Sequence, residues 1–139
     1  MIPMKQKKSE QQIVAENNLL LAQYGFYAHY LWPPVNGYVN YHTHGLFITK
    51  KHLDLQIVLS IEQKLAHGIF WTFVQHINAG ETFEPNRFIS GIVKDYQVKL
   101  ILAEEANREV IRIILPDPQG RFVEQGCDPV FAGQERYKT

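Results

Sequence analysis

Two histidines, His42 and His44, stand two residues apart in the segment Tyr41-His42-Thr43-His44-Gly45-Leu46. We predict that this segment is a β-strand. The period of two along a strand sends both side chains to the same side of the sheet, about 7 Å apart along the backbone. Two imidazoles placed in this way can chelate a divalent cation or act as an acid and base pair. The pair is therefore the candidate site.

A stable divalent site normally has three or four protein ligands, so the pair would need further donors. Candidates along the chain are His52 and Asp54 nearby, and Cys127 and Asp128 in the C-terminal part. No HExxH or CxxC spacing accompanies them. The alternative interpretation is that this strand face is partly exposed or lies under the C-terminal tail, with the histidines hydrogen-bonded to backbone or carboxylates. Apart from a divalent metal at the pair, no cofactor is expected.

Other reactive side chains are interpreted as structural. Cys127 lies in a loop beside Asp128, which raises the pKa of a neighbouring thiol, so a nucleophilic role is disfavoured. Glu104 and Glu105 fall in a predicted hairpin connection and are expected to be solvated. No glycine-rich phosphate loop follows a strand. These observations disfavour an enzyme.

With 45% hydrophobic and 20% charged residues, the composition is that of a globular protein, and the length predicts a single domain over residues 1–139. Lys+Arg and Asp+Glu both total 14, so the chain has no net charge that would attract nucleic acid or a membrane surface. The single cysteine excludes an internal disulfide and fits a reducing compartment. We therefore expect a cytoplasmic protein. Residues 1–8 are expected to be flexible and 116–139 to form an irregular tail.

Two helices are predicted. The first spans 9–24, because Ser9 and Gln12 form a capping-box pattern and Gly25 is placed to end it. The second spans 61–79, opened by a similar Ser60-Ile61-Glu62-Gln63 pattern and apolar over much of its circumference. The helix-period apolar side chains of the first helix are Ile13, Val14, Leu20, Leu21 and Tyr24.

Strands are predicted from short apolar or alternating runs at 26–32, 38–47, 54–59, 97–103 and 109–115. Residues 81–96, interrupted by Pro85 and Gly91, are assigned as extended or loop. The prediction is an α+β domain with a mostly antiparallel sheet of about five strands. One long helix (61–79) and an N-terminal helix (9–24) pack on it.

Several segments in order resemble the domain-of-unknown-function family 4262, over about residues 20–134. The family pattern has Tyr-Thr-x-Gly-Leu where this chain has His42-Thr43-His44-Gly45-Leu46, so Thr43, Gly45 and Leu46 match and the histidines depart. The departure argues against a metal site common to the family and leaves open one confined to an HTHG-bearing branch. The resemblance implies a small bacterial protein without an established activity. The segments are Tyr24-Gly25-Phe26, Tyr41–Leu46, Ile114–Phe122, Gly126-Cys127-Asp128 and Gln134.

Three functions follow as hypotheses. The first is a non-enzymatic binding domain whose partner is another protein. The second is a metal-binding protein or metal-assisted hydrolase centred on His42 and His44. The third is a small-molecule pocket between the long helix and the sheet, lined by Trp71, Tyr38 and Trp32.

Overall fold

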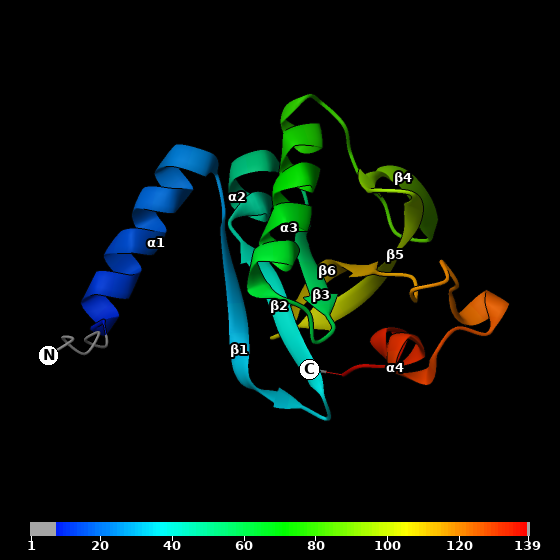
Figure 1. Cartoon of the computed structure of the whole chain (residues 1–139). Coiled ribbons are helices and arrows are strands. Elements are labelled where there is room, and N and C mark those ends of the chain that lie inside the picture. Colours follow the sequence, from blue (N-terminus) through cyan, green and yellow to red (C-terminus); the bar gives the residue numbers. More distant parts are fainter. Residues whose placement is uncertain (1–7, 139) are drawn as a thin grey trace, which may run out of the picture.

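The computed structural model describes residues 8–138, so the predicted flexible segment lies outside the described residues except for Lys8. Within this range the chain forms an α+β structure with a sheet of six strands in the order β1-β2-β3-β6-β5-β4. Figure 1 shows the sheet with its helices. None of the helices formed by residues 8–138 has the length and apolarity needed to cross a membrane. The strands are β1 Tyr27–Val35, β2 Tyr38–His44, β3 Asp54–Val58, β4 Arg87–Val93, β5 Tyr96–Glu105 and β6 Arg108–Ile114.

The sheet is mixed, because β3 and β6 pair in parallel while the other neighbours are antiparallel. The prediction of about five strands omits β4, which lies in the part assigned as extended or loop because of Pro85 and Gly91. The pairing of β4 with β5 shifts register between Ile89 and Val93, so the strand accommodates Gly91 as a local irregularity.

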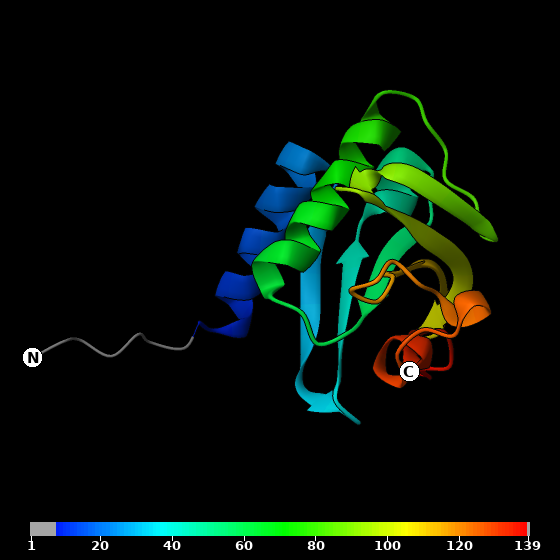
Figure 2. The same cartoon turned by 45° about the vertical axis from the view of Figure 1, so that its right-hand side comes forward.

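One face of the sheet packs against α3 (Gln63–Asn78), which lies across it in Figure 2. Val39 and Tyr41 of β2 lie in this core together with Phe70 and Phe73 of α3, as the alternation along β2 predicts. The predicted capping box at Ser60 is wrong, because Glu62 is the N-cap and makes no side-chain cap hydrogen bond. The helix is shorter than 61–79, and with 16 residues against 15 in α1 it is not a single long helix.

Helix α1 (Glu10–Tyr24) begins with the predicted capping box of Ser9 and Gln12 and ends at Gly25 with φ of 81°. Its apolar side chains, however, do not pack into the core: no α1 residue is buried, and Leu19 is 69% exposed. Figure 1 shows why, since α1 stands outside β1 at the edge of the sheet. The helix touches the body mainly near its end, where Tyr24 meets Trp71 edge-on at 5.5 Å between ring centroids.

Strand β2 ends at His44, three residues earlier than the predicted 38–47. Gly45 adopts φ of 107°, a left-handed value that a side chain disfavours, and starts the short helix α2 (Leu46–Lys50). A Cβ at Gly45 would also lie only 3.0 Å from the carbonyl oxygen of Gly25 and would force the tip of the Leu21 side chain to move. The turn therefore needs glycine for both conformation and space, and it sets His44 as the last residue of the strand.

The C-terminal segment lies on the sheet face opposite α3 and is more ordered than the predicted tail at 116–139. It contains η1 (Val123–Gln125), α4 (Pro129–Ala132) and η2 (Gly133–Glu135). Gln134 is fully buried; its amide donates to the carbonyl of Leu115 at 2.8 Å and its side-chain oxygen accepts from the N–H of Leu115 at 2.9 Å. This side chain fastens the segment to the end of β6.

Candidate metal centre

The register of the sheet places polar side chains from four strands in one row. His29 of β1 pairs with His42 of β2, His42 with Gln56 of β3, and Gln56 with Arg112 of β6. Directly paired residues on neighbouring strands point to the same face. The row therefore crosses the face opposite α3, with the histidines at the β1 edge and Arg112 beneath the C-terminal segment.

Three histidines meet at the β1 end of this row. His29, His42 and His44 each offer a ring nitrogen, and these atoms all lie within 4.8 Å of one another. The rings of His42 and His44 are 4.8 Å apart between centroids, so the pair lies together on one face, as the strand period indicates. His29 is exposed, His44 is intermediate and His42 is buried at 2% exposure. His29 was not among the predicted donors, because the pairing of β1 with β2 brings it in.

The protonation of His42 follows from a chain of hydrogen bonds that begins at Arg112. The guanidinium can only donate, so Gln56 Oε1 accepts from Arg112 Nε at 2.7 Å, and Gln56 Nε2 donates to Asn40 Oδ1 at 3.0 Å. Asn40 Oδ1 is therefore an acceptor, and His42 Nδ1, 3.2 Å away, must donate to it. This leaves the lone pair of the neutral ring on Nε2.

Asn40 is held in an otherwise unfavourable orientation. Its Nδ2 is buried and has no hydrogen-bond partner within the described part of the chain. An unpaired buried amide costs about 1–3 kcal/mol. Turning the amide over would place its NH₂ against that of Gln56. The fold thus directs the Asn40 side-chain oxygen toward His42, although this orientation leaves the amide nitrogen without a hydrogen bond.

Electrostatics keep the inner imidazoles neutral. Burial, followed by the neighbouring His44, His29 and Arg108, lowers the pKa of His42 to about 3. Burial and Arg108 also lower the pKa of His44, although Asp54 and Glu105 oppose the shift. A neutral imidazole has the free lone pair that a metal ion requires.

Carboxylates lie on the inner side of the cluster. Glu105 Oε1 is 3.9 Å from His42 Nε2, and both side chains are almost completely buried, at 5% and 3% exposure. Arg108 contacts Glu105 Oε1 through Nε and Nη2, and its Nη1 lies 3.2 Å from Asp54 Oδ2. The expectation that Glu105 is solvated in a hairpin turn is wrong, because Glu105 is the last residue of β5, pairs with Arg108 of β6 and has a buried side chain.

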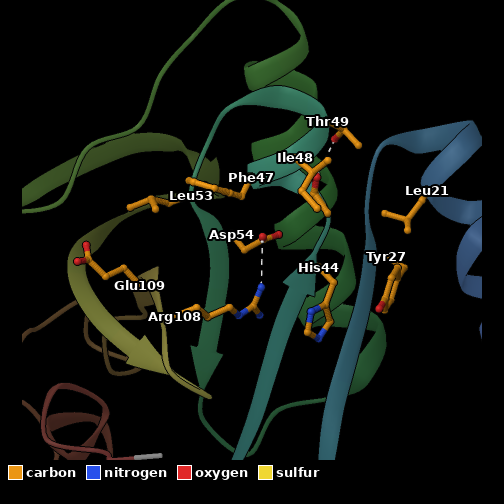
Figure 3. Close-up of a pocket in the computed structure, with 11 residues that line it drawn as sticks. Leu21, Tyr27, His44, Phe47, Ile48, Thr49, Leu53, Asp54, Arg108 and Glu109 are labelled. Atoms are coloured by element: carbon orange, nitrogen blue, oxygen red, sulfur yellow. Dashed lines mark hydrogen bonds and ion pairs between the residues drawn. The ribbon is translucent and has the colours of Figure 1, made fainter.

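A groove of about 710 Å³ opens beside the cluster. In Figure 3, His44 and Tyr27 stand side by side on β2 and β1, and Arg108 reaches toward Asp54. Tyr27 stacks on His44 with 5.1 Å between the ring centroids. Its lining combines apolar side chains with a few polar groups, which is the usual make-up of a small-molecule site. The apolar side chains include Leu21, Phe47, Ile48 and Leu53.

The other donors named from the sequence lie elsewhere or are occupied. His52 uses both ring nitrogens, since Nδ1 donates to the carbonyl of Leu53 at 2.8 Å and Nε2 accepts from the N–H of Phe83 at 2.9 Å. Asp54 lines the groove but accepts from Thr43 and from the N–H of Leu46. Cys127 and Asp128 belong to the C-terminal segment, where Asp128 caps α4. The histidine cluster includes none of the four.

The proposed pocket lined by Trp71, Tyr38 and Trp32 is not assembled. Trp71 lines a cavity of about 540 Å³ between α1, β1 and α3. Tyr38 instead donates to the carbonyl of Val130 at 2.6 Å under the C-terminal segment. Trp32 is 71% exposed. The three aromatic residues therefore lie in three different parts of the structure and do not line one pocket.

Comparison with protein families gives one finding. The model of the family described as Domain of unknown function (DUF4262) matches residues 20–128. This range holds all six strands and the three clustered histidines. No curated protein and no solved structure matches the chain.

Proposed function

The chain belongs to this domain-of-unknown-function family, and since membership names no reaction, we propose from the histidine cluster that the protein binds a divalent transition metal. The ligands are the ring nitrogens of His29, His42 and His44. The observation that carries the proposal is the convergence of these three nitrogens within 4.8 Å.

The donor set suits a borderline metal ion. Imidazole favours zinc, copper, iron and nickel over magnesium and calcium, which prefer oxygen ligands. Two nitrogens bound to a tetrahedral zinc ion at about 2.1 Å lie about 3.4 Å apart. The rings therefore need to close by a small rotation. The exposed side chain of His29 is the one with room to make it.

Three histidine ligands leave the fourth position of a tetrahedral ion to a water, a small molecule or a further side chain. His44 belongs to both the cluster and the groove, so a ligand in the groove would lie beside the ion. Metal-assisted hydrolysis would require a water to keep the fourth position. Metal binding alone is the proposed function.

The test is titration of untagged protein, purified without a nickel column, with zinc chloride in a calorimeter. The wild type should bind close to one zinc ion per chain. His29→Ala should weaken binding at least tenfold because it removes one of three ligands. His67→Ala, which removes another exposed histidine, is the matched control and should bind as the wild type does. A wild type that releases no heat and carries less than about a tenth of an equivalent of metal rules the proposal out.

Self-association is a second candidate function, favoured by apolar side chains at the β1 edge. Val14 and Leu19 of α1 are 57% and 69% exposed, and Leu31 on the adjoining β1 is 46% exposed. Strand β1 also has an unpaired side within the described sheet, which a second copy can extend. Light scattering should then give a dimer that Leu19→Glu dissociates. A wild type that is monomeric at millimolar concentration excludes this candidate.

A further inference from the structure

We propose that Glu105 is the fourth protein ligand of the cation, which makes the site a three-histidine, one-glutamate centre. The inference rests on the proposed metal binding and adds to it a ligand from the other half of the sheet. His29, His42 and His44 come from β1 and β2, whereas Glu105 is the last residue of β5, beyond β3 and β6.

The first argument is the short distance between the His42 ring and the Glu105 carboxylate. The hydrogen-bond chain from Arg112 assigns the proton of His42 to Nδ1 and leaves a lone pair on Nε2. That nitrogen lies 3.9 Å from Oε1 of the Glu105 carboxylate, too far for a hydrogen bond. Oε1 already accepts two hydrogen bonds from Arg108, so an ion bound to His42 Nε2 would take the carboxylate through Oε2.

The second argument is charge. Arg108 is ion-paired with both Asp54 and Glu105, so two carboxylates share one guanidinium. Both carboxylate side chains are only 5% exposed. A divalent cation beside Glu105 would take up part of the negative charge that Arg108 divides between the two carboxylates.

The third argument is position. Two N–H groups of Arg108, on Nε and Nη2, donate to Glu105 Oε1 at 3.1 and 2.9 Å, and Nη2 also donates to the carbonyl of Thr43 at 2.8 Å. Thr43 lies between the two histidines of β2. Arg108 is thus a positioning residue that ties the carboxylate to the strand bearing the imidazoles. This reduces the entropy lost when Glu105 binds the ion.

A centre of three nitrogens and one carboxylate oxygen specifies a class of ion. Zinc, iron(II), cobalt(II) and manganese(II) accept mixed nitrogen and oxygen ligands. Magnesium and calcium are expected to bind far more weakly, because most of their preferred oxygen ligands are missing. The carboxylate also lowers the charge of the bound dication to one.

The experiment compares zinc affinities of the wild type, Glu105→Gln, Glu104→Gln and Asp54→Asn by calorimetry. Glu105→Gln should weaken zinc binding tenfold or more, while its three histidines retain some affinity. Glu104→Gln alters the neighbouring residue, whose side chain points to the opposite face, and should stay within about twofold. Asp54→Asn removes a similar charge without removing a ligand and should stay within threefold. Equal losses for Asp54→Asn and Glu105→Gln would show that charge alone matters and would overturn the assignment.

A second measurement needs no variant. Addition of zinc to the wild type should shift a carboxylate stretching band in the infrared difference spectrum, because Glu105 changes from an ion-paired to a metal-bound carboxylate. Zinc binding without any carboxylate shift would overturn the assignment even if Glu105→Gln failed to fold. In that case the three-histidine proposal would stand, whereas a wild type that binds no zinc defeats both.

Discussion

His29 and His42 occupy directly paired positions on β1 and β2, with ring centroids 5.1 Å apart, although one side chain is exposed and the other is buried. Their rings meet edge to face at 82°. The two residues thus share one site but differ in what they contribute to the fold. This difference allows metal binding and stability to be separated by substitution.

We expect His42→Ala to lower the free energy of unfolding by about 2 kcal/mol, because it removes a buried ring and leaves a cavity beside Asn40. His29→Ala should change it by less than about 0.5 kcal/mol, as for an exposed residue. Urea denaturation in the presence of EDTA measures both values without a contribution from metal. Similar losses for the two variants would mean that His29 is not the exposed member.

Zinc should stabilise the protein, because an ion that binds only the folded state adds to its stability. At a free zinc concentration of 100 times Kd the gain is about 2.7 kcal/mol. A thermal melt should therefore move to higher temperature on addition of zinc and return on addition of EDTA. The melting temperature of His29→Ala should respond much less at the same zinc concentration. A zinc-independent melt of the wild type contradicts the expectation.

Gln134→Leu should lower the free energy of unfolding by about 2 kcal/mol or more. Leucine is similar in size to glutamine but cannot form hydrogen bonds. The substitution therefore leaves the buried N–H and carbonyl of Leu115 without the partners that Gln134 provides. Gln97→Leu is the control, since Gln97 is exposed on β5 and should cost less than about 0.5 kcal/mol. Chemical denaturation gives both numbers, and an unaffected Gln134→Leu would mean that the C-terminal segment is not fastened by this side chain.

Asp117 should make stability depend on acid pH. Burial opposes its ionisation, but the N–H groups of Arg121, Asp128 and Gln119 and the Arg121 side chain donate to the carboxylate and lower its pKa. A group with a lowered pKa stabilises the fold above its unfolded pKa of about 3.9, and that contribution is lost as the pH falls through the folded value. The stability difference between wild type and Asp117→Asn should therefore be largest at pH 7 and shrink below about pH 4.

Urea midpoints at pH 7 and pH 3 test this prediction. Asp95→Asn is the control, because Asp95 lies in an exposed turn at φ of 67°, where asparagine is equally suited. At pH 7 this substitution should change the free energy of unfolding by less than about 0.5 kcal/mol, as for an exposed residue. A constant difference for Asp117→Asn would show that the carboxylate contributes no pH-dependent stability.

Features that depend on neighbouring residues in the chain were predictable, and those that depend on pairing were not. The Ser9 capping box and the common face of His42 and His44 follow from local geometry alone. His29 joins the site only through the register of β1 on β2, which no local pattern specifies. From the sequence, Glu105 resembles a solvated turn residue. Its burial next to His42 depends on the pairing of β5 with β6.

The helices show the same division. The ends of α1 were predicted because Ser9 and Gly25 act within one turn of the helix. The burial of its apolar side chains was not, because it requires a surface to pack on, and α1 stands beyond the last strand of the sheet. At α3, Ser60 matched the local cap pattern, yet the chain entering from β3 begins the helix after Glu62.

All three imidazoles lie within the single hairpin of β1 and β2, between residues 27 and 44. Short loops close quickly and at small entropic cost, whereas the β3–β6 pairing joins residues more than fifty positions apart in the chain. An ion held by these imidazoles would therefore fix β1 against β2 and leave the long-range pairing of β3 with β6 unconstrained.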